Sequence, residues 1–233
     1  YGYNLEPGSK ELTALNYYTN EEITIPLDPT QTPGENAQCY FAKYNKQKRT
    51  FEALTELIRE TADDIEYLES IGNALDIALS EADLAQIKEE LMLSGYIRRK
   101  HTKKKVKLTS KPMHYISSDG YDMYVGKNNL QNEELTFSLA NGNDWWFHAK
   151  GTPGSHVIVK SGGDELPDQT FEEAGRLAAY YSKNRGADKV EIDYIQKKHV
   201  KKPNGAKPGF VVYYTNYSLV IDSDISNIKN VQD

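Results

Sequence analysis

Apolar side chains recur at heptad spacing in the first half of the chain. A helical pattern begins at Pro33, and it has the apolar seam of a coiled coil with a few polar defects. Gly72 and Asn73 are expected to interrupt this helix, and a second helical stripe then ends near Gly95. The pattern predicts a helical hairpin, or arm, over residues 33–97. Its apolar positions are Tyr44, Phe51, Leu54, Ile58, Ile65, Leu68, Leu84, Ile87 and Leu91.

After Pro112 the pattern changes to short alternating runs mixed with amphipathic segments. The runs predict strands and the segments predict helices. The expected strands are 113–117, 121–126, two runs within 144–160, 190–196, and 210–214 with its continuation through 219–221. The expected helices are 129–140 and 168–185, the second capped by Gly186. One further strand is expected at Ile23–Leu27.

These elements predict an α+β protein in which a helical coiled-coil hairpin arm is followed by a mixed α/β domain. Residues 1–32 are interpreted as the remnant of an upstream region, because the chain opens at Tyr1 rather than at Met. The arm then covers 33–97, a basic linker 98–111, and the mixed domain 112–233.

The stretch 144–160 is the centre of the predicted domain. Two β-prone runs flank a Gly-Thr-Pro-Gly loop, which predicts a hairpin with Trp146 opposite Ile158 and His148 opposite His156. Because strand side chains alternate, one face is expected to be apolar and the other to mix an aromatic ring with histidines and lysines. The apolar face would carry Trp145, Phe147, Val157 and Val159, and the mixed face Trp146, His148, Lys150, His156 and Lys160.

Charge is strongly segregated along the chain. The first 97 residues hold seven Lys or Arg against 18 Asp or Glu, whereas residues 98–111 hold eight basic residues and no acidic one. The basic segment is interpreted as a solvated linker, a phosphate-contacting tether, or both. A second basic stretch, residues 197–209, contains five lysines and His199 without an acid. It is either a plain surface loop or a loop that follows a nucleic-acid backbone, with Trp146, Tyr213 or Tyr214 as stacking faces.

The sequence offers no motif for catalysis or for a cofactor. It lacks a nucleophile elbow, the phosphate loops of the Walker and Rossmann types, and the spacings typical of zinc ligands. The single cysteine, Cys39, excludes an internal disulfide. Mean hydropathy is −0.70, no apolar run approaches the ~20 residues of a membrane helix, and no signal-peptide pattern is present. We therefore expect a binding protein that is not an enzyme and does not insert into a membrane.

Several ordered motifs closely resemble the NFACT family, which includes bacterial RqcH and streptococcal fibronectin-binding proteins. The central stretch resembles the family's C-terminal NFACT-R domain, and the start of the predicted arm resembles its coiled-coil region. The motifs that carry the resemblance are Leu27–Pro29, Asn36–Ala37, Tyr44–Lys46, Gly126–Asn129, Asn132–Thr136, Asp144–Ala149, Pro153–Ile158 and Lys201–Gly209.

The resemblance implies a ribosome-associated quality-control factor. Such a factor binds the large ribosomal subunit and tRNA and supports the tailing of stalled nascent chains, which implies a cytoplasmic location. The family's Asp-Arg motif for tailing lies outside this sequence, so the chain itself is expected to bind without supporting tailing. The alternative is an adhesin fragment that binds host fibronectin or fibrinogen at the cell surface without a signal peptide. Both roles are compatible with one chain, and the arm is a candidate for protein contacts.

The candidate site combines the lysine-rich loop with the mixed face of the hairpin. Lys201, Lys202 and Lys207 are predicted to contact phosphates, while Trp146 and His148 are predicted to supply a stacking or base-contacting surface. A metal site at the two histidines is the remote alternative. The residues expected to contact RNA are Lys150, Lys197, Lys198, Lys201, Lys202, Lys207, Trp146, His148 and His156.

Overall fold

The computed structural model describes residues 5–98 and 110–231, and the chain divides into two compact units, Tyr1–Asp63 and Asp64–Asp233. The boundary falls within the first long helix rather than at the basic segment. Most of that segment, residues 99–109, lies outside the described residues, so its interpretation as a linker or tether stays a prediction. Nothing in the described ranges forms a helix long and apolar enough to cross a membrane.

The first unit contains a two-stranded antiparallel sheet and the beginning of α1. Strand β1 (Glu11–Asn16) pairs with β2 (Glu21–Pro26), which confirms the strand expected around Ile23–Leu27. The helix start is fixed by a capping box. Glu35 accepts hydrogen bonds from the backbone and hydroxyl of Thr32, and its own backbone N–H donates to the Thr32 hydroxyl.

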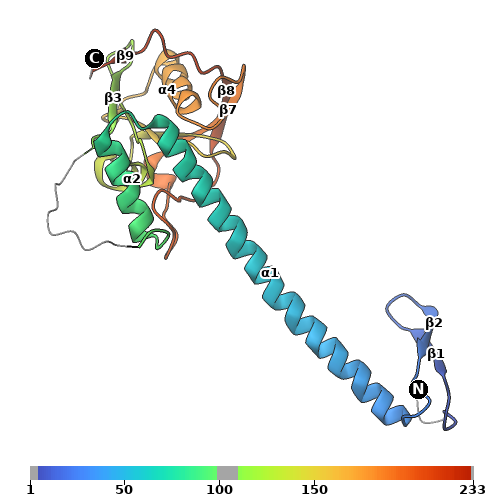
Figure 1. Cartoon of the computed structure of the whole chain (residues 1–233). Helices are drawn as coiled ribbons and strands as arrows, with labels where there is room; N and C mark the ends of the chain where they lie inside the picture. The colour runs from blue at the N-terminus through green and yellow to red at the C-terminus, as the bar shows by residue number, and fades with distance from the viewer. Residues whose placement is uncertain (1–4, 99–109, 232–233) are drawn as a thin grey trace. The chain divides into compact units, whose positions relative to one another are not determined.

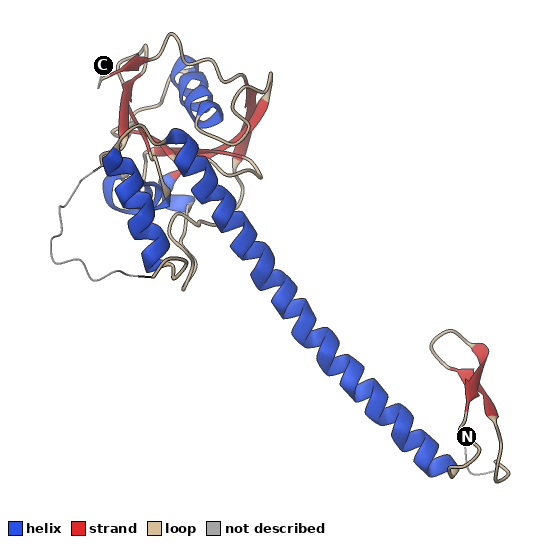
Figure 2. Cartoon of the chain, viewed as in Figure 1, coloured by secondary structure: helices blue, strands red, loops and turns tan. Residues whose placement is uncertain are grey.

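Helix α1 (Pro33–Ile77) continues through Gly72 and Asn73, so the expected interruption is wrong. A glycine inside a helix costs only about 1 kcal/mol, and packing offsets this cost here. Tyr67, Ile71 and Ala74 of α1 are buried against Ile87 of α2 (Glu81–Leu93). The reversal occurs after Ile77 instead, where Ser80 and Asp83 form a capping box that begins α2. The two helices confirm the expected helical hairpin (Figure 2). The expected apolar seam does not form its contact, however, because most of its residues are 44% to 72% exposed: Tyr44, Phe51, Leu54, Ile58, Ile65, Leu68 and Leu84.

The rest of the second unit is built on a seven-stranded sheet in the order β8-β7-β5-β6-β4-β3-β9, with every pairing antiparallel. An α+β fold is therefore confirmed (Figures 1 and 2). The elements are β3 (Met113–Ile116), β4 (Asp122–Val125), α3 (Asn129–Glu134), η2 (Leu135–Leu139), β5 (Trp145–Ala149), β6 (Val157–Val159), α4 (Asp168–Tyr180), β7 (Val190–Gln196), η3 (Lys197–His199), β8 (Tyr217–Ile221) and β9 (Lys229–Asn230).

Three expected elements differ from the structure. Helix α4 ends at Tyr180, five residues early, so Gly186 does not cap it. The region 210–214 forms no strand, because Val212 makes only an isolated bridge with Lys201 and the strand begins at Tyr217. The helix expected over 129–140 is a short α-helix followed by the π-helical turn η2. Such π-helical turns occur often at functional sites.

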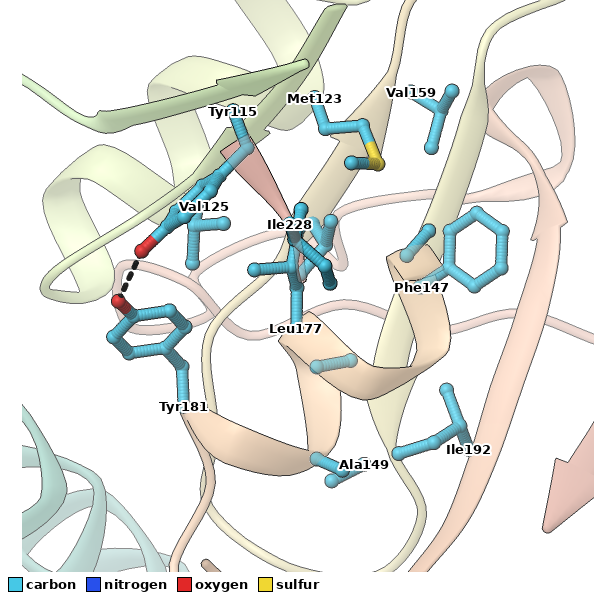
Figure 3. Close-up of a cluster of buried hydrophobic side chains, with 14 of the residues drawn as sticks. Tyr115, Met123, Val125, Phe147, Ala149, Val159, Leu177, Tyr181, Ile192 and Ile228 are labelled. Carbon is cyan, nitrogen blue, oxygen red and sulfur yellow. Dashed lines mark hydrogen bonds between the residues drawn. The ribbon is translucent and has the colours of Figure 1, made fainter. Parts of the chain in front are cut away.

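The main hydrophobic core lies between the sheet and α4. Phe147 and Val159 of the central strands, Met123 of β4 and Leu177 of α4 are fully buried in this core (Figure 3). At its border the hydroxyl groups of Tyr115 and Tyr181 form a hydrogen bond of 2.6 Å. Aromatic and branched side chains dominate, so burial of apolar area supplies most of the stability of this unit.

A buried polar network joins the helical hairpin to the sheet within the second unit. The Lys127 ammonium lies 3.1 Å from the Asp83 carboxylate, and Asn129 donates hydrogen bonds to Glu90 (2.9 Å) and Ser70 (2.7 Å). The motif at Gly126–Asn129 thus connects α1 and α2 to the start of α3. Burial disfavours the charge on Asp83, but hydrogen bonds from Ser110, the Leu79 backbone and Lys127 outweigh it and lower the pKa to about 2.

Phe147→Ala should destabilise the second unit by about 3–5 kcal/mol, because it leaves a cavity where a fully buried ring stood. Phe210→Ala deletes the same atoms at a position that is 48% exposed and should cost below about 1 kcal/mol. Urea denaturation followed by tryptophan fluorescence measures both, since Trp145 and Trp146 lie in the sheet. Equal midpoints for the two variants would contradict this assignment of the core.

Candidate nucleic-acid interface

The central hairpin has the predicted register, but both of its faces are buried. Trp146 pairs with Ile158, and Phe147 pairs with Val157 in the antiparallel ladder. The face expected to be mixed forms a second core, in which Trp146 and Ile158 pack with Leu135 of η2. Since Trp146 is 0% exposed, its ring has no face open to a base in this structure. The expected stacking surface at this position is therefore not available on the folded module.

The two histidines of the hairpin meet as expected, but His156 is buried and His148 is half-buried. The ring centroids of His148 and His156 are 5.4 Å apart and the ring planes are nearly perpendicular. His156 is buried, and its Nδ1 lies 2.8 Å from the Thr136 hydroxyl of η2. Its backbone N–H donates to the side chain of Asn132. His156 therefore anchors η2 and α3 to the sheet and is not placed to contact RNA directly.

Burial keeps both imidazoles neutral. Desolvation lowers the pKa of His148 to about 4, against smaller opposing effects of the Gly154 backbone and of Asp193, its partner in the β5–β7 register. Desolvation and the neighbouring His148 hold the pKa of His156 well below its ordinary value. The pair therefore does not supply positive charge to a phosphate at neutral pH.

Asp193 and Lys150 form a polar cluster at the end of the hairpin. The buried Asp193 carboxylate accepts hydrogen bonds from Tyr213 (2.9 Å) and Ser218 (2.6 Å). The Lys150 ammonium lies 2.5 Å from Glu191 and 4.0 Å from Asp193. The positive charge of Lys150 is thus balanced locally, which makes it a weaker candidate for phosphate contact than the sequence suggested.

The lysine-rich stretch 197–209 is anchored at its start to the turn before β5. The backbone N–H groups of Lys197 and Lys198 donate to the carbonyls of Asp144 (2.8 Å) and Gly142 (3.0 Å). Lys201 and Val212 exchange two backbone hydrogen bonds, which closes the loop at its base. A rigid frame therefore presents the lysines, although most of their side chains reach into solvent.

The far end of the loop is held by Gly209. This residue has φ of +77°, and a Cβ built on it would lie 2.9 Å from Cβ of Asn129. Only glycine fits this close approach and left-handed conformation. The Gly209 N–H also donates to Glu133 at 3.4 Å. The loop is thus clamped to α3, the element that already contacts the helical hairpin.

The five lysines of the loop fall into two groups. Lys202 is paired with Glu133 at 2.7 Å, and Lys207 is paired with Asp64 of α1. Lys197, Lys198 and Lys201 take part in no ion pair among the described residues, and the Lys197 ammonium lies 5.6 Å from the centre of the Phe137 ring. The second group carries the uncompensated positive charge of this surface.

Exposed aromatic side chains follow the loop directly. Phe210 is 48% exposed and Tyr214 is 74% exposed, whereas Tyr213 is half-buried against Trp146. Tyr213 and Tyr214 are stacking candidates from the sequence pattern, whereas Phe210 is expected in a strand. Its position after Pro208-Gly209, a pair that ends regular structure, was the signal that could have assigned it to the surface.

The geometry does not favour the metal alternative. Within residues 5–98 and 110–231, no group of three or more His, Cys, Asp or Glu side chains is placed to hold a metal ion. His156 instead has Thr136, Asn132 and Trp146 as neighbours, and His148 has the rings of Trp146 and His156. His156 thereby ties η2 to the sheet.

An antiparallel α+β module with an anchored lysine loop and adjacent exposed aromatics belongs to the class of candidate RNA-binding modules, here joined to a helical hairpin. Residues 111–215 match the family model of the NFACT protein RNA binding domain, and residues 1–110 match that of the NFACT N-terminal and middle domains. The chain belongs to the NFACT family.

Similar proteins support this assignment over nearly the whole chain. The "Rqc2 homolog RqcH" of Bacillus subtilis (strain 168) is 42% identical over 233 residues, covering 97% of this chain and 40% of that protein. The "Rqc2 homolog RqcH" of Streptococcus pneumoniae (strain D39) is 45% identical over 218 residues, covering 93% of this chain and 39% of that protein. The chain thus spans about two fifths of the length of these relatives.

A solved structure is similar as well. The C-terminal part of the fibronectin/fibrinogen-binding protein from Streptococcus suis is 43% identical, with a TM-score of 0.76. The match covers 84% of this chain and 78% of that chain. Fold and sequence therefore agree on the family.

The neutral histidines make stability depend on pH. Between about pH 6.5 and pH 4 the unfolded chain binds more protons on His148 and His156 than the folded chain, so the free energy of unfolding falls with decreasing pH. For His148 the loss should be about 1–3 kcal/mol. His148→Gln should flatten the slope in this window, measured by urea denaturation at several pH values. His199→Gln, at an exposed position, should keep the parental slope, and equal slopes for both variants would contradict the assignment.

Proposed function

We propose that this chain is the RNA-facing part of a ribosome-associated quality-control factor and that it binds tRNA and the large ribosomal subunit. The proposal rests on one structural observation, the group of unpaired lysines on a rigid loop beside exposed aromatic rings. It is supported by the match of residues 111–215 to an RNA binding domain and by relatives named Rqc2 homolog RqcH. This role is a binding role, and a cytoplasmic location follows from it.

Phosphate contacts are assigned first to Lys197, Lys198 and Lys201. Each lysine that replaces a counterion on the RNA backbone adds affinity without sequence preference, and that affinity falls as salt rises. Lys202 and Lys207 are further phosphate contacts, although both already have carboxylate partners. Phe210 and Tyr214 take the stacking role that sequence analysis gave to Trp146, because their rings are exposed.

The triple variant Lys197→Gln, Lys198→Gln, Lys201→Gln should weaken tRNA binding by roughly 10- to 100-fold near physiological salt. The slope of log affinity against log salt should also become flatter by roughly two to three. Fluorescence anisotropy with labelled tRNA across a salt series measures both quantities. The cause is the loss of three counterion-releasing contacts rather than a change of fold.

A matched control removes the same charge elsewhere in the second unit. Lys183→Gln, Lys189→Gln, Lys229→Gln changes three exposed lysines that lie outside the loop. This control should bind tRNA within about threefold of the parent chain. If the loop variant and the control lose the same affinity, net charge rather than the loop carries the binding. Unchanged binding by the loop variant at low salt would also contradict the proposal.

A second candidate function is binding of fibronectin or fibrinogen. The similar Streptococcus suis protein is named for fibronectin and fibrinogen binding, and β8 is a surface that could bind another protein. Strand β8 is a terminal strand of the sheet, and its Tyr217 and Val220 are 59% and 60% exposed. An exposed edge strand can add an extended segment of another protein by main-chain hydrogen bonds.

Val220→Lys should abolish such edge pairing, because a lysine on an edge strand opposes the addition of another strand. Binding of the chain to immobilised fibronectin, compared across a salt series, measures the effect. The loop triple variant serves as the comparison and should retain fibronectin binding if β8 carries it. Loss through the lysine variant alone would assign the binding to charge instead.

A further inference from the structure

Two of the five loop lysines each form an ion pair with a carboxylate. The two carboxylates come from different elements. Asp64 lies in α1 and contacts Lys207, whereas Glu133 lies at the end of α3 and contacts Lys202. Both are oxygen anions held close to a lysine ammonium. An RNA phosphate presents the same kind of partner to the same lysines.

The Lys207 site is the more elaborate of the two. The Tyr96 hydroxyl donates to Asp64 at 2.7 Å, and the Lys207 ammonium donates to the Tyr96 oxygen at 2.8 Å. The ammonium also lies 4.6 Å from the centre of the Tyr67 ring and 5.2 Å from that of Tyr96, two rings that stack on each other. The Lys207 ammonium is therefore held by the Asp64 carboxylate and by the rings of Tyr67 and Tyr96.

Both carboxylates are accessible. Hydrogen bonds from Lys207 and Tyr96 lower the pKa of Asp64. The side chains of Asp64 and Glu133 are 55% and 32% exposed, so solvent and solutes reach the two pairs. Partly exposed ion pairs add little net stability, and a phosphate can exchange with such a carboxylate at small cost.

We propose that Asp64 and Glu133 are autoinhibitory residues that hold Lys207 and Lys202 in the absence of RNA and are displaced by its phosphates. The inference rests on the proposed function and adds regulation to the same site. Because Asp64 lies in α1 and Tyr96 lies in the turn after α2, RNA that captures Lys207 also releases the loop from the helical hairpin. Binding of RNA and seating of the loop on the hairpin are then linked equilibria, each opposing the other.

The test replaces the two carboxylates by their neutral isosteres. Asp64→Asn, Glu133→Gln should tighten tRNA binding by about three- to tenfold near physiological salt and make the salt slope steeper by about one to two. Anisotropy with labelled tRNA and the 233-residue chain measures both. A thermal unfolding scan of each variant verifies that the module remains folded.

Sequence neighbours give a matched control. Asp63→Asn, Glu134→Gln removes the same two charges one residue away, where Asp63 pairs with Arg59 and Glu134 is exposed. This control should change affinity by less than about twofold, because its carboxylates do not hold loop lysines. An equal gain in both variants would mean generic repulsion and would overturn the inference.

A second comparison removes the lysines. In a Lys202→Gln, Lys207→Gln background, the change Asp64→Asn, Glu133→Gln should give no gain beyond that of the control. A gain that persists there would overturn the inference, because no lysine is left to release. Weaker binding of Asp64→Asn, Glu133→Gln in the parent chain would also overturn it, since the carboxylates would then be positioning the lysines for RNA.

The outcomes separate the two proposals. Normal binding by the Lys197, Lys198, Lys201 variant overturns the proposed function of the loop. Loss of binding by that variant, together with no difference between the carboxylate variant and its control, leaves the proposed function intact and overturns only the autoinhibition. Absence of tRNA binding by every variant at low salt overturns both.

Discussion

The organisation of the second unit depends on a central hairpin that is buried on both faces. Phe147 and its neighbours pack beneath α4, while Trp146 packs with Leu135 of η2 and Val200 of the C-terminal region. A sheet covered on both sides needs two layers, and those layers then have fixed positions. The lysine loop begins directly after β7, and its Val200 packs in the core around Trp146. Its geometry is therefore set by the packing around Trp146, although that residue is closed to solvent.

The same constraint explains the histidines. A buried imidazole is tolerated when it is neutral and hydrogen-bonded, and His156 meets both conditions through Thr136 and Asn132. Asn132 is in turn in contact with Gly126, where a Cβ would lie 2.2 Å from its side-chain oxygen. The segment from Gly126 to Thr136 is thus a polar connector between the hairpin, the loop and the helical pair. Its buried polar residues contact other parts of the fold, whereas the half-exposed Glu133 pairs with the loop lysine Lys202.

Buried polar groups also join the helical hairpin to the sheet domain, and Glu90 is among the most deeply buried of them. Its side chain is 0% exposed, Tyr67 and Asn129 donate to Oε1, and burial raises its pKa. Its Oε2 has no hydrogen-bond partner among the described residues, so this network gives specificity to the joint more than strength. The positive surface, in contrast, owes its properties to lysines held at a rigid base. Within the described residues, Lys202 and Lys207 of the loop have carboxylate partners, whereas Lys197, Lys198 and Lys201 have none.

The sequence alone determined the features that repeat or alternate. Helical spacing predicts two helices but not their contact, since Tyr67, Ile71 and Ala74 pack there instead of the expected seam. Strand alternation predicts the pairing of Trp146 with Ile158 and the division of its neighbours between two faces. Composition likewise located the lysines of residues 197–209 on the surface. Local periodicity and charge are properties of short segments, so they are visible before folding.

What covers each face depends on contacts that form only in the folded chain. Alternation separates the two sides of a strand but does not say whether the second side meets water or another layer, so Trp146 and His156 were expected at a surface and lie inside. Likewise, α1 continues through Gly72 while the neighbouring Ile71 and Ala74 pack against α2. Lys202 and Lys207 acquire partners from α3 and α1. These outcomes depend on contacts between residues as far apart as Asp64 and Lys207, which no local pattern records.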